Sequence, residues 1–233
     1  MTEITSPLIV DGLTPKNKPT TDEREVKRME VTLIQATPNP IDTIAKIASI
    51  CYDSNPANPM RLVKHLYKNG HHSCFEHIYF TFKITGISRA CSHQLVRHRH
   101  CSFTQRSQRY CSEDSFGMVV PNTVDLYDDE HYYTQLMFRI KANYNELCAI
   151  GVPNEDARYV LPNACATELY LSCNLRELIH IANERLCMRA QWEIRELVKR
   201  MVELVDPALD FMLVPKCKTG RIICNSPCGG GAK

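Results

Sequence analysis

The sequence predicts an α+β fold made of a few strands and several helices. Short runs rich in β-branched and aromatic residues indicate strands, and longer runs with apolar residues at helical spacing indicate helices. These runs do not alternate in the βαβ order that a doubly wound parallel sheet requires. The chain has 233 residues, of which 44% are hydrophobic and 23% charged, so one domain with short extensions can bury a sizeable core.

Three segments are predicted to be strands from their β-branched and aromatic residues. The first begins at Met29, the second covers residues 77–87 and the third lies near residues 167–173. Six segments are predicted to be helices, most of them from apolar residues at helical spacing. They are residues 41–52, 61–69, 88–97, 133–147, 175–186 and 194–205. Gly70 ends the second helix in the manner of a C-terminal glycine, and the last helix stops near Pro207.

Composition divides the chain into three parts. Residues 1–28 are polar and predict an N-terminal arm, residues 29–206 form the main domain, and residues 207–233 are a Cys- and Gly-rich tail. The sequence has no GxGxxG after a strand and no P-loop, so any nucleotide must be held by other means.

Charge and location are predicted from equally simple features. The net charge of +2 indicates no strong polyanionic partner, so neither nucleic acid nor a membrane surface is expected. No export signal and no long apolar stretch is visible, which predicts a cytoplasmic protein whose twelve cysteines are mostly reduced.

The tail cysteines leave three alternatives open. Cys217, Cys224 and Cys228, alone or with Cys187, could bind zinc, form a redox-labile disulfide or stay free thiols. Their spacing differs from the paired CxxC of zinc ribbons, so free thiols and no metal are expected.

A basic segment carries the functional information. Between Glu76 and Glu113 there is no acidic residue, whereas six Lys or Arg residues fall inside this interval. Guanidinium forks with Ser and Thr hydroxyls suit a phosphate, although a solvated basic face or a nucleic-acid patch would have the same charge. Gln94 and Arg97 share a helix face at i,i+3, and Ser107 and Arg109 should adjoin it two short turns later. That face could offer an amide to a base and cations to a phosphate.

At this segment the sequence resembles the flavin-dependent thymidylate synthases. Arg97-His98-Arg99 followed by seven residues and Ser107 fits the family signature RHR-x7-S. Further blocks agree in order and spacing, so the resemblance extends from about residue 29 to residue 205. These blocks lie at residues 70–77, 151–162, 174–176, 183–185 and 190–194.

The resemblance implies one domain with a small central, mostly antiparallel sheet flanked by long helices. It implies reductive methylation of dUMP to dTMP, with 5,10-methylenetetrahydrofolate as carbon donor and NADPH-reduced FAD as hydride source. No enzyme nucleophile is implied, and the sites should lie between subunits of a homotetramer.

By motif position, the resemblance also assigns residues. Arg185 should activate the pyrimidine, and Arg158 should contact dUMP from a second chain. The residues implied to bind dUMP are Gln94, Arg97, Gln105, Ser107, Gln108, Arg109, Arg158 and Arg185. Those implied to bind FAD are Ser73, Arg97, His98, Arg99, Gln105, Asn174, Arg176 and His180. His71 should lie near the flavin ring, where folate or nicotinamide stacks.

Two positions depart from the family pattern. Gln105 stands where Glu is common, and His180 stands where Asn often helps hold the flavin.

Two other classes of function compete with the enzyme. A nucleic-acid module would use residues 97–109 and a tail zinc, but the sequence shows no zinc-finger or helix-turn-helix pattern. A metal-dependent hydrolase would need a ligand pair such as HExxH, which the sequence lacks.

Overall fold

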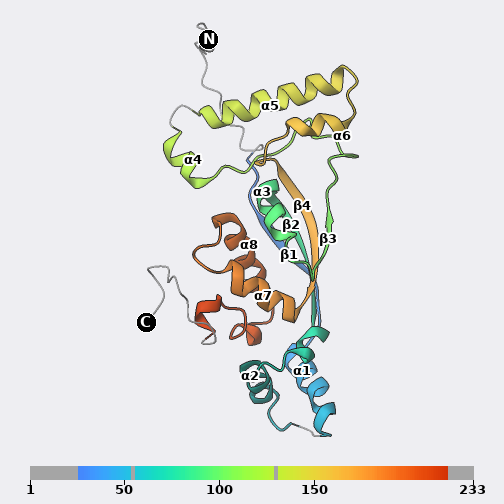
Figure 1. Cartoon of the computed structure of the whole chain (residues 1–233), viewed down its shortest axis with the longest axis vertical. Helices are drawn as coiled ribbons and strands as arrows, with labels where there is room; N and C mark the ends of the chain where they lie inside the picture. Colours follow the sequence, from blue (N-terminus) through green and yellow to red (C-terminus); the bar gives the residue numbers. More distant parts are fainter. Residues whose placement is uncertain (1–25, 54–55, 129–130, 220–233) are drawn as a thin grey trace, which may run out of the picture.

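The computed structural model describes residues 26–53, 56–128 and 131–219, and its centre is one four-stranded sheet (Figure 1). The sheet order is β1-β2-β4-β3, and every neighbouring pair of strands is antiparallel. The strands are β1 (Glu30–Ala36), β2 (Tyr79–Ser88), β3 (Ser102–Gln105) and β4 (Ala166–Asn174). The predicted α+β fold with a small antiparallel sheet is therefore confirmed.

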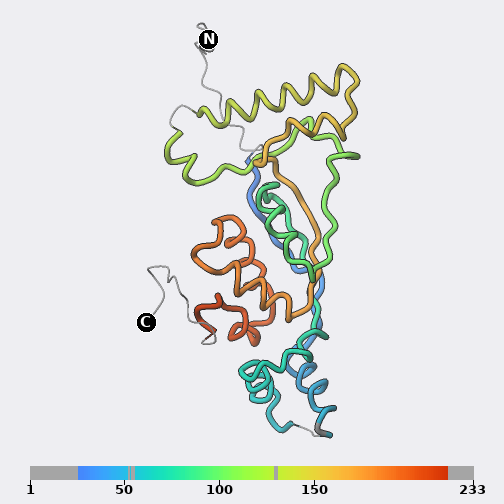
Figure 2. The backbone as a smooth tube through the Cα atoms, viewed as in Figure 1, coloured from blue at the N-terminus to red at the C-terminus, as the bar shows by residue number. Residues whose placement is uncertain are grey.

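The helices gather at both ends of the sheet and on one face of it (Figures 1 and 2). They are α1 (Pro40–Ser49), α2 (Pro59–Asn69), α3 (Arg89–Leu95), α4 (Asn122–Tyr127), α5 (Tyr132–Ala149), α6 (Asn154–Ala157), α7 (Leu175–Arg185) and α8 (Trp192–Glu203). Short 3₁₀ turns are η1 (Ile50–Tyr52), η2 (Ser73–His77), η3 (Arg158–Val160), η4 (Pro207–Leu209) and η5 (Lys216–Lys218). In Figure 1, α1 and α2 lie at one end, α5 and α6 at the other, and α7 and α8 lie along one face.

The core lies between the sheet and α7 and α8, because the two central strands turn alternate residues to one face. In β2 the buried residues include Phe80, Phe82 and Ile84, and in β4 they include Leu169 and Leu171. Residues between them, such as Tyr170, are exposed on the opposite face. This alternation is typical of an antiparallel sheet covered on one side.

Two central strands lead directly into helices, and a polar N-cap fixes each junction. Ser88 ends β2, and its Oγ accepts the Cys91 N–H of α3 at 3.0 Å. Asn174 ends β4, and its Oδ1 accepts the Glu177 N–H of α7 at 2.9 Å. Because Asn and Ser are favoured caps, these positions fix where both helices start, and both helices carry site residues.

The segment after α3 differs from the prediction. The helix ends at Leu95, so Arg97 lies in the following turn, although its N–H still bonds the Gln94 carbonyl at 3.3 Å. Residues 102–105 then form β3, which sequence composition did not predict. The expectation that Ser107 and Arg109 follow Arg97 after two short turns is wrong, because a strand separates them.

The long helix α5 also differs in burial. The stripe predicted from Tyr133 to Leu147 is present on the helix, but only Met137 and Tyr144 of that stripe are buried. The sequence did not predict α4 or α6. Among the described residues, none of the helices has the length and apolar character needed to traverse a lipid bilayer.

Residues just beyond the predicted domain boundary at residue 206 pack into the core. Leu209, Met212 and Leu213 are buried there, and the Tyr67 hydroxyl approaches the Met212 carbonyl at 3.5 Å. Cys187 and Cys217 are free thiols, whereas Cys224 and Cys228, for which zinc, a disulfide or free thiols were considered, lie outside the described residues. The division into arm, domain and tail stays a prediction.

Candidate functional site

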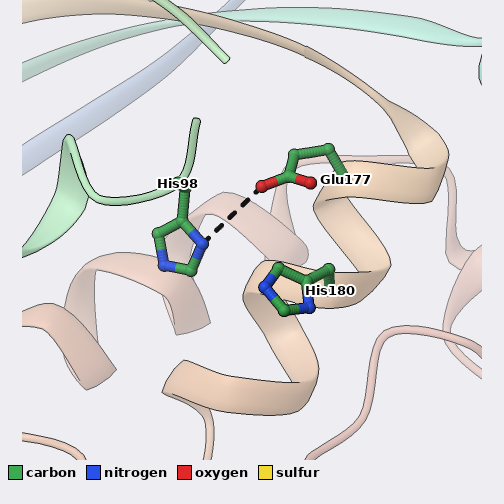
Figure 3. Close-up of side chains that lie close together, drawn as sticks. All are labelled: His98, Glu177 and His180. Atoms are coloured by element: carbon green, nitrogen blue, oxygen red, sulfur yellow. Dashed lines mark ion pairs between the residues drawn. The ribbon is translucent and has the colours of Figure 1, made fainter. Parts of the chain in front are cut away.

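The centre of the candidate site is His98, a buried ring that contacts both ends of α7. The turn after α3 delivers His98, which is 5% exposed, beside the helix (Figure 3). Arg185, in the last turn of α7, donates its Nε–H to His98 Nε2 at 3.0 Å. Glu177, in the first turn, places Oε1 3.7 Å from His98 Nδ1. His180 lies edge-on to His98, with the ring centroids 5.6 Å apart.

The environment keeps His98 neutral. Burial lowers its pKa to about 4, and the Arg185 and His180 charges act in the same direction. Burial raises the pKa of Glu177, although His180 and His100 oppose this shift. A neutral imidazole has one donor and one acceptor nitrogen, so the ring can accept from Arg185 while it donates toward Glu177.

A polar cavity of about 710 Å³ opens beside this cluster, between α7 and η2. Asn174, Arg176 and His180, three residues that are predicted to contact the flavin, are among the residues that line it. Arg176 is ion-paired with Glu76 across the cavity. The buried Asn183 Oδ1 has no hydrogen-bond partner among the residues that the structure describes, which favours a ligand that offers a donor. Sequence reasoning gave no role to Glu177 or Asn183, although Asn-x-x-Glu at residues 174–177 is a recognisable helix start.

Two predicted flavin-side residues lie apart from this cavity. His71 and Ser73 line a separate cavity of about 290 Å³ on the other side of η2. Within one chain the structure therefore does not join them to Asn174 and Arg176. Arg99 is exposed in the turn after His98. A larger cavity of about 770 Å³, which residues 26–30, 112–117 and 166–168 help to line, contains none of the predicted site residues.

Apart from Gln105, the predicted dUMP residues fall into two groups, on elements that Figure 1 places toward the two ends of β3. Gln94, Arg97 and Arg185 belong to the end near α7, where the Arg185 charge also acts on the Cys91 thiol of α3. The other group, Ser107, Gln108, Arg109 and Arg158, lies near α6.

The group near α6 is held by local contacts. Arg109 binds Glu155 with Nη2 2.8 Å from Oε2, and its N–H reaches Ser107 Oγ at 3.2 Å. Arg158 donates to the Glu155 carbonyl at 2.9 Å, and Gln108 Nε2 lies 3.6 Å from Cys165 Sγ.

Gln105 lies between the two groups, on β3. Its amide nitrogen donates to Ser92 Oγ at 3.1 Å and to Thr167 Oγ1 at 3.2 Å. These bonds tie β3 to α3 and to β4. The observed contacts of Gln105 thus hold the strand that separates the two groups.

The chain is similar to known proteins over most of its length. The family model described as "Thymidylate synthase complementing protein" matches residues 32–209. A flavin-dependent thymidylate synthase from Geobacter sulfurreducens is 41% identical in an alignment of 208 residues that covers 82% of this chain and 90% of that protein. A flavin-dependent thymidylate synthase from Clostridium tetani is 34% identical, covering 83% of this chain and 90% of that protein.

A solved structure shares the fold. The UMP/dUMP methylase PolB from Streptomyces cacaoi, bound with 5-Br dUMP, superimposes with a TM-score of 0.67 at 22% sequence identity. The match covers 75% of this chain and 88% of PolB. The extent of the family match and the identity to its members assign this chain: it belongs to the family of flavin-dependent thymidylate synthases.

Proposed function

We propose that the chain methylates dUMP to dTMP with a bound flavin. In this proposal 5,10-methylenetetrahydrofolate donates the carbon and NADPH reduces the FAD. The observation that carries it is the guanidinium of Arg185, which the buried His98 imidazole contacts in the last turn of α7, the helix whose earlier residues line the polar cavity. Family membership supports the reaction, and it favours this enzyme over a nucleic-acid module or a hydrolase.

The residues of the cavity beside α7 fit a flavin nucleotide. Arg176 and His180 offer donors for phosphate or ring oxygens, and Asn183 Oδ1 is a buried acceptor that lacks a partner in the described part of the chain. FAD would be held by Ser73, Arg97, His98, Arg99, Gln105, Asn174, Arg176 and His180, with His71 near its ring. When bound, the flavin supplies hydride, and the protein supplies binding and orientation.

Arg185 is proposed to activate the uracil. C5 of uracil is a weak nucleophile, so electron density must be pushed toward it. A fixed guanidinium near N3 and O4 stabilises the anionic form of the ring by charge and hydrogen bonding. Gln94 and Arg97 are proposed to contact the same nucleotide.

The cysteines near this region fit a mechanism without an enzyme thiolate. Burial raises the pKa of Cys91, and it raises the pKa of Cys165 to about 12. A hydrogen bond with Cys101 and, after it, burial also raise the pKa of Cys173. Buried thiols with raised pKa values are poor nucleophiles because little thiolate forms.

We also propose a cytoplasmic homotetramer with sites shared between subunits. The separation of the two groups of dUMP residues by β3 supports this arrangement. Arg185 of one subunit would then face Ser107, Gln108, Arg109 and Arg158 of another. The half-exposed apolar stripe of α5 offers surface for such contacts.

The test of the function is the Arg185→Ala variant. Loss of a preorganised donor typically slows a reaction by about 10²–10³-fold, so dTMP formation should collapse by that factor. FAD content should be retained. Arg185→Lys should also be impaired, because lysine keeps the charge but lacks the planar fork. FAD absorbance, NADPH oxidation and dTMP formation are measured separately.

Arg200→Ala is the matched control, because Arg200 pairs with Glu196 on the exposed side of α8. It should keep its dTMP formation. Near-parental dTMP formation in Arg185→Ala would refute the role of this arginine.

A cysteine variant tests the absence of an enzyme nucleophile. Cys101 is the cysteine within the RHR-x7-S segment, and it is half-buried beside Cys173. Cys101→Ser should leave dTMP formation measurable. Complete loss of the product, with flavin and dUMP still bound, would indicate a cysteine-based mechanism instead.

A further inference from the structure

Glu177 has an unexplained position in the site. It is 6% exposed, and its Oε1 lies 3.7 Å from His98 Nδ1 (Figure 3), whereas Arg185 contacts the other ring nitrogen, Nε2. A carboxylate is costly to bury unless a donor or charge faces it. The contact with His98 therefore calls for a role beyond packing.

The hydrogen bond from Arg185 settles which nitrogen of His98 carries the proton. Arginine can only donate, so His98 Nε2 must be an acceptor. A neutral imidazole then has its proton on Nδ1, the nitrogen that faces Glu177. The carboxylate stabilises this tautomer, and the tautomer in turn presents a lone pair to Arg185.

We propose that Glu177 is a positioning residue that orients Arg185 through His98. The imidazole ring links the first and last turns of α7. The carboxylate therefore fixes the orientation of the ring, and the ring fixes the orientation of the guanidinium. The inference rests on the proposed function only for its effect on catalysis. The orientation of the ring is a property of the chain itself.

Two other roles fit parts of the geometry. Glu177 follows the Asn174 cap by three residues, so it could serve only to start α7. His98, Glu177 and His180 also place ligand atoms within 4.8 Å of one another, as a metal site would. A metal on Nδ1 would require that nitrogen to lose its proton while Nε2 still accepts from Arg185. A neutral ring cannot supply both lone pairs, so the geometry favours the arrangement in which Nδ1–H faces Glu177 and Nε2 accepts from Arg185.

The first experiment determines the tautomer of His98 and needs no turnover. Nitrogen-15 NMR of the purified protein should show protonated Nδ1 and unprotonated Nε2 in the parent. Glu177→Leu should weaken this preference, because only the Arg185 hydrogen bond would still favour it, whereas Glu177→Gln should keep it because the amide oxygen still faces Nδ1–H. A parent with protonated Nε2, or coordination of added Zn²⁺ at Nδ1, would overturn the proposal.

The second experiment separates positioning from folding. Changes in groups that orient a reacting residue typically cost about 10–100-fold, so kcat of Glu177→Leu should fall by about that factor. KM for dUMP, FAD content and Tm should stay near the parental values. Glu177→Gln should recover most of kcat. Equal kcat in the parent and Glu177→Leu, or a joint loss of Tm and FAD, would overturn the proposal.

Glu184→Gln provides the matched control. Glu184 lies on the same helix and its charge also acts on His98, but its carboxylate contacts Lys216 at 3.3 Å rather than the ring. Its kcat should be unchanged. When Glu177→Leu is added to Arg185→Lys, kcat should fall little further, because the effects of coupled residues are not additive. A parent that forms no dTMP would instead refute the proposed function, and the tautomer would still be measured.

Discussion

At the scale of single residues, Arg109 already has an anionic partner. Glu155 binds its Nε at 2.9 Å and its Nη2 at 2.8 Å, and both side chains are about half exposed. Exposed ion pairs contribute little to stability, so Arg109 can exchange this carboxylate for a phosphate at low cost. The Ser107 hydroxyl lies next to it and is a matching donor.

We therefore predict that Arg109→Ala weakens dUMP binding roughly tenfold to a hundredfold, as expected for a charge-assisted bond worth about 1.5–3 kcal/mol. Binding of deoxyuridine should be weak in the parent and insensitive to the change. Isothermal titration with both ligands measures this. Arg106→Ala is the control, because Arg106 pairs with Glu113 instead. Equal losses for nucleotide and nucleoside would contradict the phosphate role.

His98 should make stability depend on pH. Its pKa falls from 6.5 to about 4 on folding, so the unfolded chain binds more protons between these values. Stability should therefore drop as pH falls from 6.5 to 4, by about 3 kcal/mol from this group alone. Burial raises the pKa values of Glu113 and Glu177, which acts in the opposite direction above pH 4.5.

Comparison of variants isolates the histidine. Urea unfolding at several pH values should show a smaller loss at acidic pH in His98→Gln than in the parent. His65→Gln, which changes an exposed histidine of α2, should follow the parent. Identical pH profiles for the parent and His98→Gln would contradict the lowered pKa.

At the scale of elements, the sequence predicted the strands and helices whose residue composition fits only one kind of secondary structure. Residues 77–87 are rich in β-branched and aromatic residues because they run through the core as β2, and Gly70 ends α2 at φ 79°. In contrast, β3 contains Ser, Phe, Thr and Gln and is flanked by arginines. Its position is fixed by pairing with β4, a long-range contact that local composition cannot indicate.

The same limit applies to the site. The motif predicted His98 and Arg185 as functional residues, but basic neighbours gave no sign that the His98 ring is buried against α7. The burial depends on how α7 packs, 77 residues later in the chain. Likewise, the spacing of Arg97 and Ser107 did not reveal that a strand holds them apart.

Gly86 is an element-scale position where the backbone excludes other residues. It lies within the β-bulge of β2 at φ 70°, and an added Cβ would lie 2.1 Å from the Arg28 carbonyl oxygen. A non-glycine residue at such a backbone conformation costs about 1–3 kcal/mol before any clash. Gly86→Ala should lower the free energy of unfolding in urea by at least that much.

Gly70→Ala separates backbone strain from the clash. Gly70 also has a positive φ, 79°, but an added Cβ would meet nothing within 4 Å. Gly70→Ala should lower the free energy of unfolding by about 1 kcal/mol. If Gly86→Ala were no more destabilising than Gly70→Ala, the close approach of Arg28 would not matter.

At the scale of the whole molecule, the residues proposed to bind dUMP form two halves of one site, on elements that Figure 1 places at the two ends of β3. Arg185 lies at the α7 end with His98, and Arg158 lies at the α6 end with Glu155. Neither half has both the activating guanidinium and the phosphate-binding residues. A shared site in a symmetric oligomer would bring the halves of different subunits together.

Subunit mixing tests this arrangement. Arg158→Ala and Arg185→Ala homomers should each form little dTMP. When the two variants are unfolded together and refolded as mixed oligomers, a shared site can combine the intact Arg158 of one subunit with the intact Arg185 of another. Random assembly of equal amounts should then restore about a quarter of the parental activity, because each site draws its halves from independent subunits. Refolding either variant alone is the control. Light scattering measures the subunit number, and activity confined to the level of the single variants would show that both arginines act within one chain.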